Sequence, residues 1–171
     1  NNVDHCTRLC HASSVAAMLE ILGSAAVSNQ VSDILKAEVA IIIGAKPTVN
    51  HPVAATFMKN AAKNGTKIVV IDPYRSELTR HAEHFFQLTP DTDVALLNSL
   101  MHVIIKEKLY DFEFIDKRTV DFEKLRRCVK SYSPKKVAPI CGVTAQEIEA
   151  VARLYANAKS AMIFWGMGVS Q

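Results

Sequence analysis

The first eleven residues hold the densest group of side chains that can do chemistry. They read NNVDHCTRLCH and contain two cysteines, two histidines, an aspartate and an arginine. A thiolate is a soft metal ligand and a nucleophile, and an imidazole can take up and release protons near pH 7. Arg8 and the start of a following helix would both favour a thiolate at Cys10. This segment is therefore a candidate metal-binding or catalytic site.

The residue types of this segment leave three interpretations open. His5, Cys6, Cys10 and His11 could bind zinc, although their spacing matches no common zinc finger or ribbon. Cys6 and Cys10 could form a disulfide across one helical turn, although disulfides are rare in the cytosol. Cys10 and His11 could also pack at the start of a helix, and the residue types alone favour this third interpretation.

Short apolar runs and amphipathic patterns predict the elements that would position these residues. Strands buried on both faces of a parallel sheet are expected at Val39–Ile43, 68–71 and Ala161–Trp165, with a weaker strand at 85–88. Helices are expected at 13–21, Pro52–Lys63, 93–107 and 121–131, from Ser133-Pro134, and from the capping box Thr144-Ala145-Gln146-Glu147 to about Ala156. Residues 39–72 form a βαβ unit, so we expect a Rossmann-like α/β fold, a mostly parallel sheet with helices on both faces.

Three segments would lie beyond the carboxyl ends of these strands, where parallel sheets bind ligands. They are Gly44-Ala45-Lys46-Pro47, Asp72-Pro73-Tyr74-Arg75 and Gly166-Met167-Gly168. Glycines let the backbone approach a ligand closely, helix starts favour phosphate, and an acid after the second strand can accept hydrogen bonds from a ribose or base. Ordinary turns could have the same composition. Neither GxGxxG nor GxxxxGK[ST] occurs, so no particular nucleotide is indicated.

Length and composition exclude several classes of protein. The chain has 171 residues, a formal net charge of +3 and 49% hydrophobic residues. This is about one domain's length, and the balance argues against disorder and against a nucleic-acid partner. Four cysteines are too few for a disulfide scaffold, and no apolar run is long enough to span a membrane. No signal-peptide pattern is visible, so a cytoplasmic location is expected.

Residues 1–11, followed by Ala12-Ser13-Ser14-Val15-Ala16, resemble the catalytic segment of molybdenum- or tungsten-dependent formate dehydrogenases. These enzymes belong to the molybdopterin oxidoreductase (dimethyl sulfoxide reductase) superfamily. The resemblance continues in order through Gly44-Ala45-Lys46-Pro47-Thr48-Val49-Asn50-His51-Pro52, Asn64-Gly65-Thr66-Lys67, Asp72-Pro73, Asp93-Val94-Ala95-Leu96-Leu97-Asn98, Tyr155-Ala156 and Trp165-Gly166-Met167-Gly168-Val169. It implies part of a larger multidomain enzyme, in which residues 1–38 carry the catalytic Cys-His segment and residues 39–171 form a Rossmann-like cofactor-binding region.

The resemblance also implies a reaction, the oxidation of formate to carbon dioxide or its reverse. The implied centre is molybdenum or tungsten held by bis-molybdopterin guanine dinucleotide. Cys10 matches the position that ligates the metal, and His11 matches the adjacent histidine proposed to handle the formate proton. The chemistry agrees, because a soft sulfur suits a high-valent metal and imidazole can accept a proton. Electrons would pass to a 4Fe-4S cluster and then to electron-transfer subunits or domains.

Further residues match segments that line the cofactor in these relatives. They are Gly44, Ala45, Lys46, Pro47, Asp72, Pro73, Arg75, Pro90, Thr92, Asp93, Gly166, Met167, Gly168 and Gln171. The chain departs from the family at Lys46, where many relatives carry Asn, and at Tyr74, where Arg is frequent. Lys46 could contact a phosphate, and Arg75 could replace the missing arginine. Ala12 stands where some relatives carry Gly.

Two parts of the family's machinery fall outside the chain. The cysteine motif for the iron–sulfur cluster would precede Asn1, and the arginine that would hold the formate carboxylate would follow Gln171. We therefore expect an internal fragment of a catalytic subunit that neither ligates the cluster nor turns over alone.

Two other functions stay open. A periplasmic-type nitrate reductase also uses a cysteine ligand, but such relatives resemble Cys-Met at the position of Cys10-His11, so His11 favours formate. A non-catalytic nucleotide- or metal-binding module would use the same pair for packing or for zinc.

Overall fold

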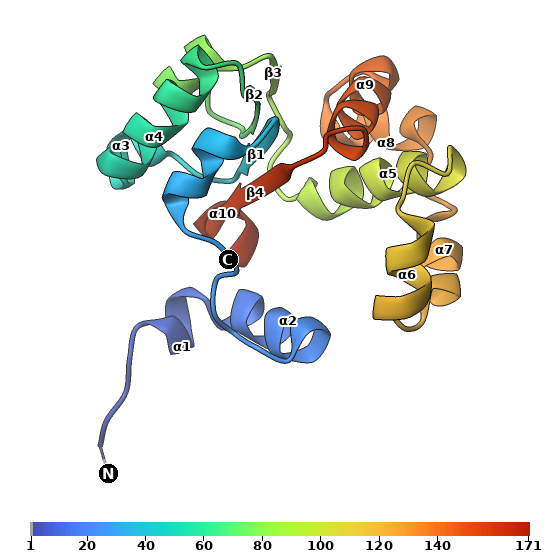
Figure 1. Cartoon of the computed structure of the whole chain (residues 1–171), viewed down its shortest axis with the longest axis horizontal. Coiled ribbons are helices and arrows are strands. Elements are labelled where there is room, and N and C mark those ends of the chain that lie inside the picture. The colour runs from blue at the N-terminus through green and yellow to red at the C-terminus, as the bar shows by residue number, and fades with distance from the viewer. Residues whose placement is uncertain (1) are drawn as a thin grey trace. The chain divides into compact units, whose positions relative to one another are not determined.

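The computed structural model describes residues 2–171, which fall into two compact units (Figure 1). Residues 2–85 and Met162–Gln171 form the first, which we call the sheet unit, and Phe86–Ala161 form the second, the helical unit. Asn1, the first residue of the predicted catalytic segment, lies outside the described residues. The helical unit is inserted in the chain between the third and fourth strands. The functional division between residues 1–38 and 39–171 stays a prediction.

The sheet has four strands, β1 (Val39–Ile43), β2 (Lys67–Ile71), β3 (His84–Phe86) and β4 (Ala161–Trp165), in the order β3-β2-β1-β4. β1 and β2 pair in parallel, from Val39 opposite Lys67 to Ile43 opposite Ile71. β4 continues this direction, because the Gly166 amide donates to the Ile43 carbonyl (3.1 Å) and the Gly168 amide to the Gly44 carbonyl (3.0 Å). The predicted α/β fold is thus confirmed. The fourth expected strand lies slightly earlier than residues 85–88.

Apolar burial holds the centre of the sheet unit. All five residues of β1 are buried, and in β2 Lys67 alone is exposed. The expectation that Ala161–Trp165 is also buried on both faces is wrong, because no residue of β4 is buried in the chain and Ile163 and Trp165 are exposed. Their β-branched side chains suit strands that are covered on both faces. α4 (Pro52–Lys63), which has the predicted bounds, and η1 (Val31–Lys36) contact each other. The cluster that joins them to the sheet contains Ile34, Ala40, Ile42, Met58, Ala61, Ile68, Val70 and Leu78.

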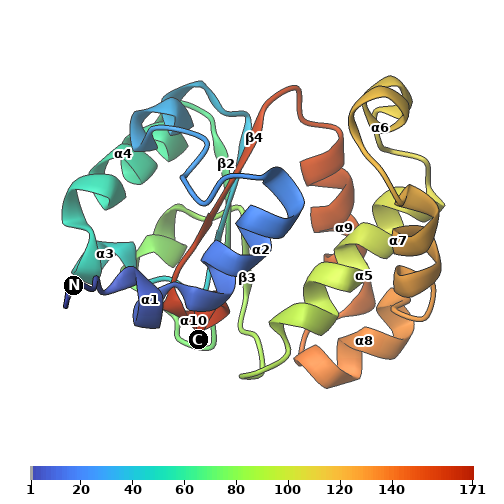
Figure 2. The same cartoon turned by 90° about the horizontal axis from the view of Figure 1, so that it is seen from below.

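Short helical turns occur where the chain enters or leaves these elements (Figure 2). They are α1 (Thr7–Cys10), α3 (Pro47–Asn50), η2 (Glu77–His81) and α10 (Met167–Ser170). The sequence did not predict them, because segments of four or five residues carry too little periodicity. α2 (Ala12–Leu22) extends one residue beyond the predicted helix at each end.

The helical unit contains α5 (Asp93–Lys106), α6 (Phe112–Arg118), α7 (Phe122–Val129), α8 (Pro134–Cys141) and α9 (Ala145–Ala156). α5 contacts α7, α8 and α9. The predicted capping box of α9 is present, since the Glu147 amide donates to Thr144 Oγ1 (3.2 Å) and the Thr144 amide to Glu147 Oε2 (2.9 Å). Within residues 2–171, no helix is both long and apolar enough to cross a membrane.

α6 was missed because its apolar side chains do not point to a core. Phe112 and Phe114 are both more than half exposed, and no α6 residue is buried. The helix is defined at its start by Asp111, whose Oδ1 accepts from the Phe114 amide (2.9 Å).

The ends of β1 and β4 meet through glycines. An added Cβ at Gly166 would lie 2.5 Å from the Gly44 carbonyl oxygen, and one at Gly168 would lie 2.8 Å from the Gly44 Cα. Gly44 also has a φ of +57°, a conformation that other residues adopt with strain. This close backbone approach therefore requires glycine at all three positions.

Replacing Gly168 by alanine should weaken the contact between β1 and β4. Backbone atoms cannot move aside as a flexible side chain can, so we expect a loss of roughly 1–3 kcal/mol in the local free energy of opening. Hydrogen-exchange mass spectrometry of the peptides that contain β1 and β4, in the protein that carries this chain, measures it. Gly23→Asn is the control, because a Cβ at Gly23 meets nothing within 4 Å and asparagine tolerates its positive φ. Unchanged exchange in Gly168→Ala would contradict this account.

An ion pair between Glu107, the residue after α5, and Arg153 of α9 should make the helical unit sensitive to acid. Arg153 donates from Nε and Nη2 to the two carboxylate oxygens of Glu107 (2.8 and 2.7 Å), and these hydrogen bonds lower the pKa of Glu107. A carboxyl group whose pKa is lowered on folding stabilises the fold above its unfolded pKa. That contribution is lost as the pH falls through the folded pKa.

Glu107→Gln should therefore speed hydrogen exchange in α5 and α9 at pH 7, and the difference from wild type should shrink in acid. Exchange rates corrected for their intrinsic dependence on pH test this. Glu113→Gln is the control, because the Glu113–Lys117 pair lies within one exposed helix. A difference that persists in acid would show that the glutamine disturbs packing instead.

Candidate functional site

Cys10 and His11 lie at the junction of two helices. Cys10 is the last residue of α1, and His11 separates α1 from α2. The Cys10 amide donates to the Cys6 carbonyl (2.8 Å) and the His11 amide to the Thr7 carbonyl (3.0 Å), which fixes the backbone of the pair. Cys10 is half-buried with a free thiol, and His11 is exposed. The fold therefore presents a thiol and an imidazole side by side at an accessible corner.

The first turn of α2 is attached to α10, at the other end of the chain. Ser13 Oγ donates to the Ser170 carbonyl, and Ser14 Oγ and Ser170 Oγ are hydrogen-bonded at 2.6 Å. Trp165 Nε1 donates to Ser14 Oγ (3.0 Å). Gln171 Nε2 donates to the Cys10 carbonyl (3.5 Å), a long bond at the edge of the hydrogen-bonding range. α2 and α10 lie side by side in both views (Figures 1 and 2).

These contacts bring the Cys-His pair to the carboxyl edge of the sheet, which we define as residues 44–47, 72–75 and 166–168. Gly166 and Gly168 lie between Trp165 and Ser170, and both touch Gly44. The predicted site residues Cys10, Gly44, Gly166, Gly168 and Gln171 are thus brought together. Met167, also predicted, is exposed on the same turn, α10.

Two cationic side chains lie over aromatic rings at this edge. Lys46 Nζ is 4.2 Å from the centre of the Tyr74 ring, and the Arg75 guanidinium is 4.5 Å from that of Phe85. Such contacts orient a cation without neutralising it. Lys46 therefore touches Tyr74, and both cations remain able to attract an anion.

Asp72 organises the turn that follows β2. Its Oδ1 accepts from the Tyr74 amide (2.7 Å), so this oxygen shapes the turn. Pro73 is exposed in the same turn. On the β1 side Ala45 packs against the core, and Pro47 is buried at the start of α3. These four predicted site residues, with Lys46 and Arg75, follow β1 and β2 as expected.

Sequence reasoning missed two hydroxyl groups at this edge. Among residues 2–171, Thr48 Oγ1 and Ser76 Oγ are buried without a hydrogen-bond partner, and each belongs to the residue directly after this edge, following β1 and β2 respectively. Buried polar atoms normally have partners, so each is suited to meet a polar group of a ligand. Threonine and serine are common in turns, and no spacing signal distinguishes these two from the others.

Pro90, Thr92 and Asp93 belong to the helical unit, at the start of α5. Thr92 is the residue before the helix, and its Oγ1 donates to the Thr89 carbonyl (2.6 Å) instead of capping α5. The Thr92 carbonyl accepts from the thiol of Cys141 (3.5 Å), whose pKa is raised by burial. These three predicted residues therefore belong to the helical unit, whereas the other predicted site residues belong to the sheet unit.

The structure tests the alternatives for the first eleven residues. All four cysteines are free, so Cys6 and Cys10 are not joined by a disulfide. Among residues 2–171, no three His, Cys, Asp or Glu side chains are grouped as metal ligands, so the four-residue zinc site is not formed.

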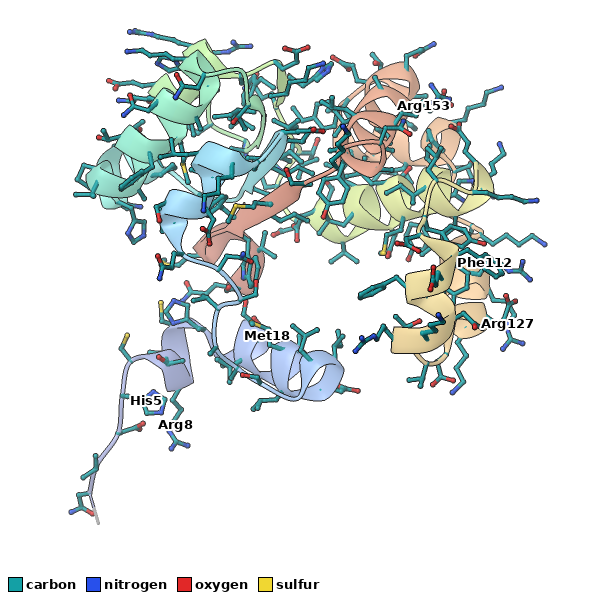
Figure 3. The ribbon with its side chains drawn as sticks, viewed as in Figure 1. His5, Arg8, Met18, Phe112, Arg127 and Arg153 are labelled. Atoms are coloured by element: carbon teal, nitrogen blue, oxygen red, sulfur yellow. The ribbon has the colours of Figure 1, made fainter. Side chains whose placement is uncertain are left out.

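Arg8 forms an ion pair with a residue four positions earlier in the chain. Its Nε donates to Asp4 Oδ1 (2.7 Å), and this hydrogen bond lowers the pKa of Asp4. Figure 3 shows Arg8 and His5 on the N-terminal segment and Met18 on α2. The expectation that Arg8 favours a thiolate at Cys10 stays a prediction. The start of α2 does follow the pair directly, as expected.

The arrangement suits a metal held by an anionic organic ligand. A thiol can ligate a soft metal, and the neighbouring imidazole can hold or release a proton. Glycines bring backbone close to the same place, and two cations with two buried hydroxyls offer partners to anionic and polar groups.

Comparison with known proteins agrees with this chemistry. Residues 1–171 match the family described as Molybdopterin oxidoreductase. Over all 171 residues the chain is 44% identical to "Formate dehydrogenase H" of Escherichia coli (strain K12), of which it covers 24%. It is 43% identical to "F420-dependent formate dehydrogenase subunit alpha" of Methanocaldococcus jannaschii, of which it covers 25%. The chain thus spans about a quarter of the length of the curated relatives it matches.

A solved structure gives the same assignment for the fold. Acetylene hydratase from Pelobacter acetylenicus is similar with a TM-score of 0.74 and 33% sequence identity. The similarity covers 82% of this chain and 21% of that one. The sheet and these matches lead to one conclusion: the chain belongs to the molybdopterin oxidoreductase family.

Proposed function

We propose that this chain is part of the catalytic subunit of a formate dehydrogenase. The enzyme would oxidise formate to carbon dioxide, or run the reverse reaction, at a molybdenum or tungsten centre. The observation that carries the proposal is the position of Cys10-His11, attached through α2 and α10 to the carboxyl edge of the sheet. The names of the relatives that are 44% and 43% identical over the whole chain support formate as the substrate.

The residues present fit a bis-molybdopterin guanine dinucleotide. Cys10 would ligate the metal, since its thiol is free and half-buried. Lys46 and Arg75 would attract the phosphates, and the unpartnered hydroxyls of Thr48 and Ser76 would bond polar groups of the ligand. The remaining predicted contacts are Gly44, Ala45, Pro47, Asp72, Pro73, Pro90, Thr92, Asp93, Gly166, Met167, Gly168 and Gln171.

His11 would act as the proton acceptor. Oxidation of formate to carbon dioxide releases one proton and two electrons. When bound, the metal centre supplies the two-electron acceptor that this reaction needs. The exposed imidazole of His11 adjoins the Cys10 ligand, so it can take up the proton and pass it to water.

The electrons would leave through a 4Fe-4S cluster to electron-transfer subunits or domains, in a cytoplasmic enzyme. Residues outside this chain would ligate that cluster. The arginine that binds the formate carboxylate would also come from outside, because no arginine of this chain lies in the matching motif.

Replacing Cys10 by alanine should abolish formate oxidation in the enzyme that carries this chain, because the metal loses its protein ligand. Turnover with formate, together with the molybdenum and tungsten content, measures this. Cys6→Ser is the matched control, since Cys6 is an exposed free thiol in the same helical turn. Normal formate turnover by Cys10→Ala would refute the assignment. If the wild-type enzyme reduces nitrate and does not oxidise formate, a nitrate reductase is favoured. If zinc is the sole metal that it contains, a non-catalytic module is favoured.

Replacing His11 by glutamine should lower kcat by roughly 10²–10⁴-fold while the metal content stays unchanged, because glutamine cannot take up the proton. Steady-state kinetics over a range of pH and metal analysis check both parts. His5→Gln is the control, since His5 is exposed in the same segment. Loss of the metal in His11→Gln would show that the side chain is structural.

A further inference from the structure

The helix that follows the Cys-His pair has almost no apolar anchor. None of the residues of α2 is buried, and Leu19, Ile21 and Leu22 are each more than half exposed. Burial of apolar side chains, the usual force that holds a helix in place, therefore contributes little within the sheet unit. Within residues 2–171, α2 is therefore held mainly by the polar contacts of its first turn.

Those contacts form a connected set of three side chains. Trp165 Nε1 donates to Ser14 Oγ (3.0 Å), and Ser14 Oγ shares a 2.6 Å hydrogen bond with Ser170 Oγ. The carbonyl of Ser170 also accepts from Ser13 Oγ. Ser170 is only 9% exposed, so its bonds are shielded from water. A hydroxyl that both donates and accepts strengthens its two hydrogen bonds together.

The set acts at the junction that carries Cys10 and His11. Ser14 lies in the first turn of α2, and the Val15 amide closes that turn on the His11 carbonyl (2.8 Å). His11 has no side-chain capping bond of its own. At the other end, Trp165 is the last residue of β4 and precedes Gly166, which touches Gly44. The three side chains thus connect the Cys-His backbone to the carboxyl edge of the sheet.

Serine at these helix positions would normally bond to its own backbone. A serine near a helix start tends to accept from nearby backbone amides or to bond a carbonyl in its own turn. Here the side chains of Ser13 and Ser14 instead reach residues more than 150 positions away in the chain. The hydrogen-bonding capacity of the first turn is thereby used to set its position relative to β4.

We infer that Ser14, Trp165 and Ser170 are positioning residues that hold the Cys10-His11 pair in register with the carboxyl edge of the sheet. This rests on the proposed function, in which Cys10 ligates the metal and His11 takes the proton. The three side chains touch neither substrate nor metal in this scheme, and they act through the first turn of α2.

The test uses Ser14→Ala, Trp165→Phe and the double variant in the enzyme that carries this chain. Each single variant should lower kcat by roughly 10–100-fold, as loss of an outer hydrogen-bond partner of a metal ligand does. KM for formate and the metal content should stay close to wild type, and the pH profile of kcat should shift. The double variant should be little worse than Ser14→Ala, because Ser14→Ala already removes the hydrogen bond that Trp165→Phe breaks.

Two further variants separate position from packing. Ser14→Thr keeps the hydroxyl and should restore most of kcat. Ser28→Ala is the matched control, because the Ser28 hydroxyl donates to its neighbour Asn29 (2.8 Å), so this variant should leave activity unchanged. A loss of kcat in proportion to lost metal, a failure of Ser14→Thr to restore activity, or strictly additive effects in the double variant would each overturn the inference.

A second measurement keeps this inference distinct from the proposed function. Hydrogen exchange in the peptide that spans residues 10–15 should be faster in Ser14→Ala and in Trp165→Phe than in wild type or Ser28→Ala, whatever the substrate. If wild type fails to oxidise formate yet the exchange rates change as described, the proposed function is refuted and the attachment stands. Unchanged exchange with normal formate turnover would refute the attachment alone.

Discussion

The site depends on one steric constraint, the backbone contact between Gly44 and the pair Gly166 and Gly168. With glycine at these positions the ends of β1 and β4 come together at distances that any Cβ would prevent. The chain can then turn through α10 directly beside the sheet, which leaves Ser170 where the first turn of α2 can reach it. A side chain at any of the three would push α10 outward and withdraw the partner that holds α2, and with it the Cys-His pair.

Different forces hold the two sides of the site. Buried β-branched and aliphatic side chains hold β1, β2 and α4 together. The free energy of this apolar burial is large, but it is not directional and does not orient a distant loop. α2 is held by directional hydrogen bonds, which contribute modest net free energy but specify geometry. This division suits a centre whose cofactor needs a rigid surface on one side and a well-placed ligand on the other.

Local patterns predicted the longer elements well. Val39–Ile43 and Ala161–Trp165 are continuous apolar runs, and Thr144 with Glu147 forms a cap whose two reciprocal bonds are encoded within four residues. α6 escaped prediction because Phe112 and Phe114 face solvent, so its hydrophobic pattern marks no core. α1, α3 and α10 escaped because a single turn has no period to detect.

The sequence by itself determined the parallel strand–helix–strand unit, the segments at its carboxyl edge, and the adjacency of a thiol and an imidazole at Cys10-His11. Each of these features depends on residues that are close together in the chain, so hydrophobic periodicity and backbone preferences can predict it. Only the tertiary structure decided that Ser14 meets Trp165 and Ser170, that Lys46 lies over Tyr74, and that Phe86–Ala161 form a separate compact unit. These contacts join residues far apart in sequence, and their geometry arises from packing that no local pattern records.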